Sequence, residues 1–164
     1  MAYRNNIGKT VYYSTVLPAT NNKAGFEALS WVELECPVSL PQFGVTHANI
    51  DVPALSGFTA GVKGAATGMD TTGAAIIKDS TLTTNQLAFK ALCDGALGNC
   101  ALKIGTGTGA ATESGLALAT GDKVEYAAGY VHSYQDNAKD NSTYEGFQYG
   151  FHQNGITVKD VEPA

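Results

Sequence analysis

The sequence predicts a mainly β protein, a β-sandwich or barrel of about seven or eight strands with one flanking α-helix. Several stretches alternate apolar and polar residues with the period of two that is typical of strands, and a single stretch carries signals for both ends of a helix. No strand–helix–strand alternation is present. Charged residues make up 15% of the 164 residues, and 19 residues are glycine. A chain of this composition is too apolar and too weakly charged to remain disordered.

The length fits one domain over residues 1–164 with a single core. The net charge of −5 argues against a protein that grips nucleic acid, because phosphate binding depends on lysine and arginine. No apolar stretch is long enough for a membrane helix, and the first residues lack the apolar segment of a signal peptide. We therefore expect a cytoplasmic protein without a membrane partner, in which Cys36, Cys93 and Cys100 are buried reduced thiols.

The chain opens with a polar, irregular segment, residues 1–9. This composition predicts an N-terminal arm that orders only against another surface. Residues 9–17 are rich in β-branched and aromatic side chains and predict a strand. The polar residues 18–24 predict a turn before the next element.

Residues 25–45 predict a helical start, a strand and a stop. The alternation from Trp31 to Val38 predicts a strand with two distinct faces. Pro37 and Pro41 end this strand because neither can donate a backbone hydrogen bond, and Phe43-Gly44 then turns the chain. The predicted core face carries Val32, Leu34, Cys36 and Val38, and the opposite face carries Trp31, Glu33 and Glu35.

Residues 46–61 are apolar but interrupted by Pro53 and Gly57. A long connection of this kind is uncommon in a compact domain and is usually functional, so we expect a loop that lies on another subunit. Residues 62–78 predict a hairpin of small residues, interrupted by Gly68 and Gly73.

The clearest local signal is a helix over residues 84–94. Thr83 and Gln86 have the spacing of a capping box, Leu82 and Leu87 that of a hydrophobic staple, and Gly95 suits the C′ position. A polar stripe of Gln86, Lys90 and Asp94 leaves the rest of the circumference apolar. We interpret that wide apolar surface as contact with a neighbouring subunit; the alternative is that loops of the same chain cover it.

The second half of the chain predicts further strands. Residues 99–104 should point Cys100, Leu102 and Ile104 inward, and Gly155 should lead into a last strand over 156–161. Two long strands, 124–135 and 143–152, flank a polar turn and should be joined by cross-strand aromatic pairs. One face of the first strand carries Val124, Tyr126, Ala128, Tyr130, His132 and Tyr134, and one face of the second carries Glu145, Phe147, Tyr149 and Phe151.

Motifs for catalysis, cofactors and metals lack their structural context. Residues 105–110 fit a dinucleotide-binding glycine pattern with Glu125 further on, but no parallel strand–helix–strand unit surrounds them. His47, His132 and His152 are far apart in sequence, although strand pairing allows the last two to be neighbours. Asp136 and Asp140 lack the oxygen spacing of a calcium loop. We therefore predict neither an enzyme nor a cofactor or metal site.

These elements resemble those of a known family, in order along the chain. Trp31, Glu33, the apolar alternation and Phe43-Gly44 after a proline resemble the opening motif of the tail tube (major tail) proteins of long-tailed bacteriophages. The resemblance continues through the single helix at 84–94 and the aromatic C-terminal hairpin that ends at 156–158. It also includes Lys63-Gly64, Asp70 and Gly73.

The resemblance implies a structural virion protein, made in the host cytoplasm and located in the virion tail. Its six-membered rings would stack into a tube through which double-stranded DNA passes without specific binding. Further partners would be the tape measure, terminator and distal tail proteins. Because a DNA conduit should be neutral or acidic inside, the candidate lumen residues are Glu33, Glu35, Glu125 and, more weakly, Glu145. The candidate subunit-interface residues are Tyr3, Arg4, Phe43, Val52, Leu55, Phe58 and Phe89.

A second function from another class also fits the predicted fold. The tyrosine-rich face over residues 126–134 is suited to a soluble β-sandwich module that binds a sugar or a protein. Rings or tubes formed by the purified protein would favour the first function, and a monomer with ligand affinity would favour the second.

Overall fold

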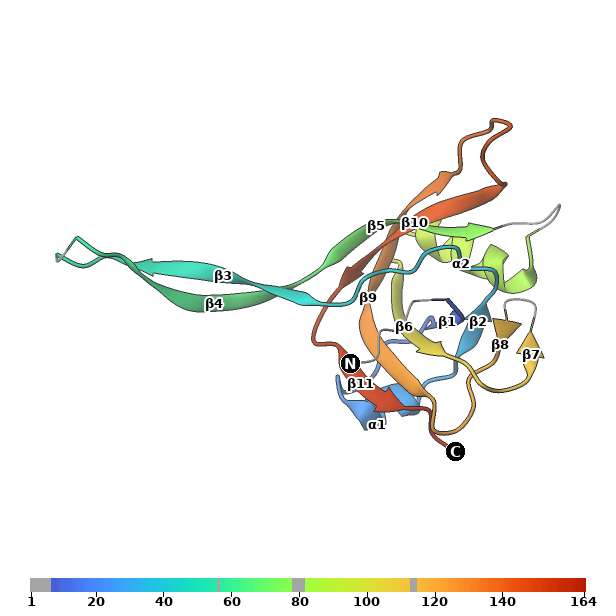
Figure 1. The fold of residues 1–164 in the computed structure, drawn as a ribbon, viewed down its shortest axis with the longest axis horizontal. Helices are drawn as coiled ribbons and strands as arrows, with labels where there is room; N and C mark the ends of the chain where they lie inside the picture. The colour runs from blue at the N-terminus through green and yellow to red at the C-terminus, as the bar shows by residue number, and fades with distance from the viewer. Residues whose placement is uncertain (1–6, 56, 78–81, 113–114) are drawn as a thin grey trace.

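The computed structural model describes residues 7–55, 57–77, 82–112 and 115–164 of a mainly β chain (Figure 1). Two helices accompany the strands, so the predicted fold class is confirmed and a short N-terminal helix is added to it. The elements in chain order are β1 (Lys9–Ser14), α1 (Lys23–Glu27), β2 (Val32–Leu34), β3 (Val45–Val52), β4 (Ala60–Gly68), β5 (Asp70–Ile77), α2 (Thr84–Asp94), β6 (Asn99–Thr106), β7 (Ala111–Thr112), β8 (Gly115–Leu116), β9 (Lys123–Asp136), β10 (Gly146–Gln153) and β11 (Val158–Val161).

One seven-stranded antiparallel sheet forms the body of the molecule. Its strand order is β2-β1-β6-β9-β10-β5, and β11 pairs with the beginning of β9. The chain that leaves β2 then meets the opposite end of the sheet, where Pro37 bridges to Ile76. The Val38 amide donates to the Ala75 carbonyl at 2.9 Å, and the Ile77 amide donates to the Cys36 carbonyl at 3.0 Å. These contacts join the two ends of the sheet and close it into a barrel.

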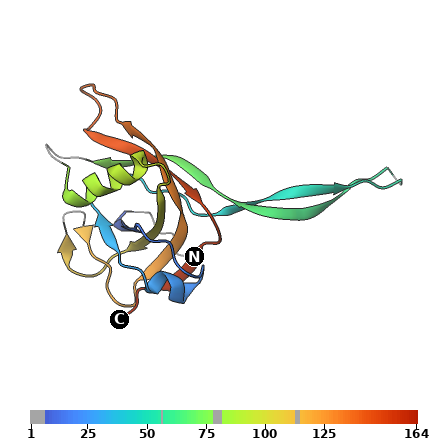
Figure 2. The ribbon, with the colours of Figure 1, turned by 180° about the vertical axis from the view of Figure 1, so that it is seen from behind.

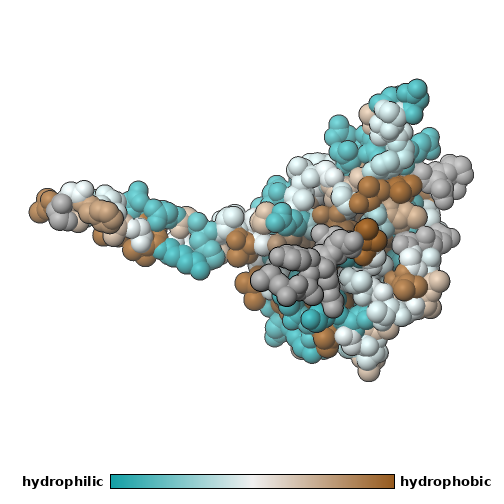
Figure 3. All heavy atoms as spheres, in the orientation of Figure 1, coloured by the Kyte–Doolittle hydropathy of each residue, from teal (hydrophilic) through white to brown (hydrophobic). Residues whose placement is uncertain are grey.

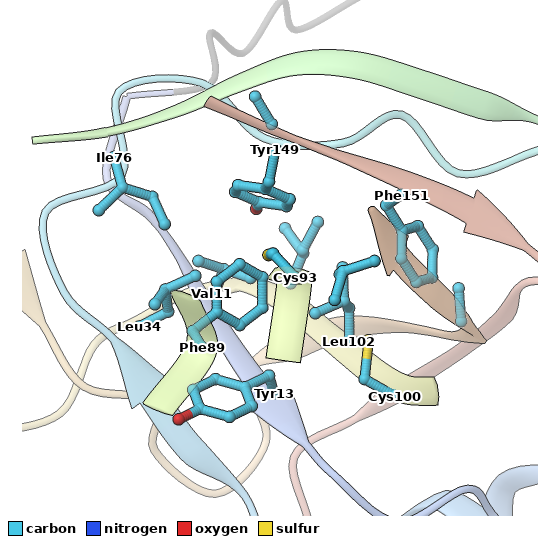
Figure 4. Close-up of a cluster of buried hydrophobic side chains, with 14 of the residues drawn as sticks. Val11, Tyr13, Leu34, Ile76, Phe89, Cys93, Cys100, Leu102, Tyr149 and Phe151 are labelled. Atoms are coloured by element: carbon cyan, nitrogen blue, oxygen red, sulfur yellow. The ribbon is translucent and has the colours of Figure 1, made fainter. Parts of the chain in front are cut away.

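The main core fills the barrel and is closed on one side by α2. Phe89 has no exposed surface and packs edge-to-face against Tyr13 and Tyr149, with ring centroids 5.1 and 4.8 Å apart (Figure 4). The inward direction predicted for β6 is confirmed by its three apolar side chains in this core. A second, smaller cluster lies beneath α1 and contains Phe26, Ala101, Val124, Tyr126 and Ala128.

Helix α2 begins as predicted but presents a different face to the core. The capping box between Thr83 and Gln86 is present. Gln86 is nevertheless buried rather than part of a polar stripe, because its amide nitrogen donates to the carbonyls of Glu35 and Ile77 at 3.1 and 3.0 Å. Gly95 has φ −72°, so the helix ends without the left-handed residue expected there.

The opening strand is shorter than predicted, since β2 covers three residues. Cys36 adopts a positive φ of 53°, which breaks the alternation after Leu34. Val32 and Val38 are exposed, and the predicted core face is therefore correct for Leu34 but wrong for these two valines.

The region predicted as a loop, 46–61, contains most of β3 and the start of β4, and the described residues of the predicted hairpin, 62–77, do not pair with each other. Strands β3 and β4 pair with each other in a long two-stranded hairpin, whereas β5 continues from β4 and pairs with β10 in the barrel. Figures 1 and 2 show this hairpin, which we call the arm, projecting far from the barrel. Strand β4 spans the boundary between these two predicted regions. Its many small residues give no strand signal in the sequence.

Strands β9 and β10 pair as predicted, with one irregularity. Their register shifts between the pairs Gln148 with Gln135 and Gly150 with His132, and Ser133 lies at φ 57°. An extra residue in one strand turns the side chains that follow it to the other face. Tyr134 therefore packs against Phe147 on the core side, although the alternation placed it with Tyr126.

Candidate assembly surface

The arm has no core of its own. Every residue of β3 is exposed, and no residue of β4 is buried. An isolated two-stranded hairpin is at best marginally stable in water. The arm therefore lacks the buried packing that stabilises the barrel, and it is a candidate surface for contact with another molecule.

The arm exposes several large apolar side chains. Leu55 and Phe58 at its tip are 110% and 77% exposed, and Figure 3 shows hydrophobic residues at this end of the molecule. Ile50 and Val62 form an apolar cross-strand pair between the tip and the root of the arm. A large exposed apolar surface on a protein usually marks an interaction site. The apolar set is Val45, Ile50, Val52, Leu55, Phe58 and Val62.

The root of the arm is fixed to the barrel by a tight joint. The Gly44 amide donates to Oε1 of the buried Gln153 at 2.9 Å. The Met69 amide donates to the Gly44 carbonyl, and the Gln153 amide donates to the Met69 carbonyl, both at 3.0 Å. A Cβ atom at Gly68 would lie 1.7 Å from the Gln153 carbonyl oxygen, so no larger residue fits. The two ends of the arm thus leave the barrel side by side.

A cluster of titratable side chains lies beside this joint. Asp70 begins β5 directly after the arm, and its Oδ1 is 2.8 Å from Nε2 of His132. Its Oδ2 is 3.8 Å from Nδ1 of His152. Strand pairing therefore does make the two histidines neighbours. Within the described residues, no group of three or more His, Cys, Asp or Glu side chains is arranged to hold a metal ion.

The predicted interface residues lie in different environments. Val52, Leu55 and Phe58 are exposed on the arm. Phe43 is partly buried and packs on Phe151, with centroids 5.8 Å apart. The prediction for Phe89 is wrong, because a side chain with 0% exposure in its own core cannot contact a neighbour. Tyr3 and Arg4 lie outside the described residues.

The predicted lumen carboxylates are not brought together on one surface. Glu33 accepts a hydrogen bond from Oγ1 of Thr112 at 2.9 Å. Glu35 accepts bonds from Thr83 and Asn85, both at 2.9 Å, at the N-terminus of α2. A negative charge there complements the helix dipole. The other two carboxylates have separate environments. Glu125 lies 3.6 Å from Nζ of Lys159, and Glu145 is exposed in the loop before β10.

The tyrosine-rich face does not form an open binding surface. Tyr126 is 1% exposed, stacked against Phe26 at 5.2 Å and tilted against Trp31 at 5.7 Å. Burial raises its pKa. Tyr130 stacks on His152, and Tyr134 has moved to the other face. The register shift and α1 therefore remove the basis for a ligand site made by consecutive alternate tyrosines.

A buried ion pair that the sequence did not reveal fastens the C-terminal strand to the barrel. Lys103 is 4% exposed, and its Nζ lies 2.8 Å from Oε1 of Glu162, just after β11. The same nitrogen lies 4.9 Å from the ring centroid of Tyr12 and 5.3 Å from that of Trp31. Cation–π contacts of this kind favour a desolvated cation. The alternation of β6 indicated its apolar residues but not this lysine, because its partner is far away in sequence.

Neither a scan against protein-family models nor a search of curated proteins gives a match. Among the described residues, the structure contains no helix that is both long and apolar enough to cross a membrane.

Proposed function

We propose that this protein is a structural subunit of a phage tail tube, in which six-membered rings stack into a conduit for genome ejection. The observation that carries the proposal is the arm, which exposes apolar side chains and has no packing partner within the described chain. The motif resemblance supplies the specific assembly, and the mainly β fold is compatible with it.

The arm also suits assembly through its backbone. In the described structure, β3 and β4 pair only with each other, so each has a free edge that can accept a strand from a neighbour. The barrel sheet, by contrast, is closed through Pro37 and Ile76. A continuous sheet around the lumen would therefore be completed by the arms rather than by the barrels.

The charge of the chain fits a conduit for DNA. A net charge of −5 per subunit disfavours the counterion release that binds DNA to basic proteins, and passing DNA would not be retained. Glu145 is the most accessible of the four lumen candidates, because the other three contact groups in their own chain. The proposed location is the virion tail, with the tape measure, terminator and distal tail proteins as further partners.

The test is the assembly state of the purified protein. We expect light scattering to show association that increases with concentration, and negative-stain electron microscopy to show six-fold rings or tubes. Leu55→Ser combined with Phe58→Ser at the arm tip should reduce assembly by at least about tenfold, which corresponds to about 1.4 kcal/mol.

The matched control is Leu97→Ser, which removes an apolar side chain of 76% exposure from the barrel body. It should assemble like the unmodified chain. A protein that remains monomeric over the whole concentration range, or that assembles equally well with the arm-tip variant, would contradict the proposal.

A further inference from the structure

The joint between the arm and the barrel contains side chains whose charge depends on pH. Asp70, the first residue after the turn out of the arm, contacts His132 of β9 and His152 of β10. Histidine is the side chain whose charge changes between about pH 5 and 8. We propose that these three residues form a latch, closed by protonation, that holds the root of the arm against the barrel.

The two histidines have different roles in this latch. Nε2 of His132 is already within hydrogen-bond distance of Asp70, while its Nδ1 lies 2.6 Å from Oγ of Ser133. A neutral His132 can therefore donate to Asp70 and accept from Ser133. Nδ1 of His152 is 3.8 Å from Asp70, which is an ion-pair distance but too long for a hydrogen bond. A proton on His152 consequently adds an attraction that the neutral side chain lacks.

The net charge of this cluster depends on the number of protons that it holds. The titratable side chains in contact with the two imidazoles, in the part of the chain that the structure describes, are Asp70 of β5 and Tyr130 of β9. One proton makes the cluster of Asp70 and the two histidines neutral overall. A second would place two positive charges beside one carboxylate, which like-charge repulsion opposes. The ring of Tyr130, stacked on His152 at 5.1 Å, can also stabilise the imidazolium.

The position of the cluster connects its charge to the arm. Asp70 directly follows Met69, whose amide and carbonyl make two of the hydrogen bonds that fix the arm root. Gln153 directly follows His152, and its Oε1 accepts the hydrogen bond from the Gly44 amide. A stronger attraction between Asp70 and the histidines therefore opposes separation of β5, and of the arm root that precedes it, from β10. At lower pH, we expect the arm to open less often from its position in this structure.

Amide hydrogen exchange measured by NMR tests the latch directly. After correction for intrinsic rates, the protection of the Met69 and Gln153 amides should increase about two- to fivefold between about pH 8 and pH 5.5, as expected for a partly exposed ion pair. The Leu102 amide, in the middle of the barrel, serves as the reference for changes in global stability. Unmodified protein in which all three amides respond equally would overturn the proposal.

Variants separate the latch from other histidine effects. Asp70→Asn keeps the shape of the side chain but removes the charge, and it should abolish the pH response at Met69 and Gln153. His152→Gln should do the same, and it provides an independent test if the first variant does not fold. His47→Gln changes the exposed histidine of the arm itself and should keep the full response. A response that persists in Asp70→Asn or His152→Gln would also overturn the latch.

Discussion

The barrel and the arm differ in how their side chains are buried, although they belong to one chain. In the barrel, alternate side chains enter a common core, and Leu34, Phe89 and Phe147 have no exposed surface. In the arm, both faces of β3 are exposed. The barrel therefore derives its stability from its own packing, whereas the arm has little to gain from folding alone. This difference is the basis of our proposal that the barrel specifies the fold and the arm serves assembly.

The largest change expected from one substitution is in the barrel core. Phe89→Ala should lower the free energy of unfolding by about 3 to 5 kcal/mol, because the ring packs against Tyr13 and Tyr149. Urea denaturation measures this change. Leu87→Ala on the same helix, where the side chain is 52% exposed, is the control and should cost much less. Equal losses from the two would mean that α2 does not close the core as described.

The buried ion pair should show the next largest effect. Glu162→Gln removes the carboxylate from Lys103 and should destabilise the barrel by about 3 kcal/mol, because a buried cation is left without a counterion. Chemical denaturation should also show that adding Lys103→Met restores much of this loss. If the double variant is no more stable than Glu162→Gln, unpaired charge is not the cause.

One barrel substitution should increase stability. The Tyr149 hydroxyl is buried and has no hydrogen-bond partner among the described residues, and burial raises the pKa of this phenol. Tyr149→Phe removes an unsatisfied polar group while keeping the ring, so the free energy of unfolding should rise by up to about 1 kcal/mol. Thermal and urea unfolding measure the gain. A clear loss of stability would show that the hydroxyl does have a partner.

The smallest effect appears only in alkali. Burial raises the pKa of the Cys93 thiol from 9.0 to about 12. The unfolded thiol ionises first as pH rises, so the stability that this group contributes is complete below about pH 9 and falls above it. At about pH 9.5, Cys93 should account for a loss of about 0.8 kcal/mol. The difference in unfolding free energy between the unmodified chain and Cys93→Ala, followed against pH, measures it, and a constant difference would contradict the assignment.

The barrel was largely predictable because its signals are local. The capping box at Thr83, the inward residues of β6 and the pairing of β9 with β10 all follow from short patterns. The failures have physical causes of longer range. Cys36 at positive φ directly precedes the residue that bridges to Ile76, and Ser133 at positive φ lies at the register shift between β9 and β10. The periodicity of the sequence predicts neither feature.

The arm was predicted as a contact region but with the wrong structure. Its two strands are exposed on both faces and rich in small residues, so neither shows the alternation that one buried face imposes. The apolar character of 46–61 predicted an interaction surface, which stays a prediction, and the exposure of Leu55 and Phe58 is compatible with it. The joint with Gln153 and the cluster at Asp70 depend on residues far apart in sequence, and only the fold brings them together.

Removal of the arm tests the central claim most directly. Gly44 and Met69 are joined by a hydrogen bond of 3.0 Å, so residues 45–68 can be replaced by a short glycine linker. The account predicts that urea unfolding of this variant changes by less than about 1 kcal/mol, while light scattering and electron microscopy show that rings and tubes are lost. A deletion variant that still forms rings, or a barrel that unfolds without its arm, would contradict the division of roles between the two regions.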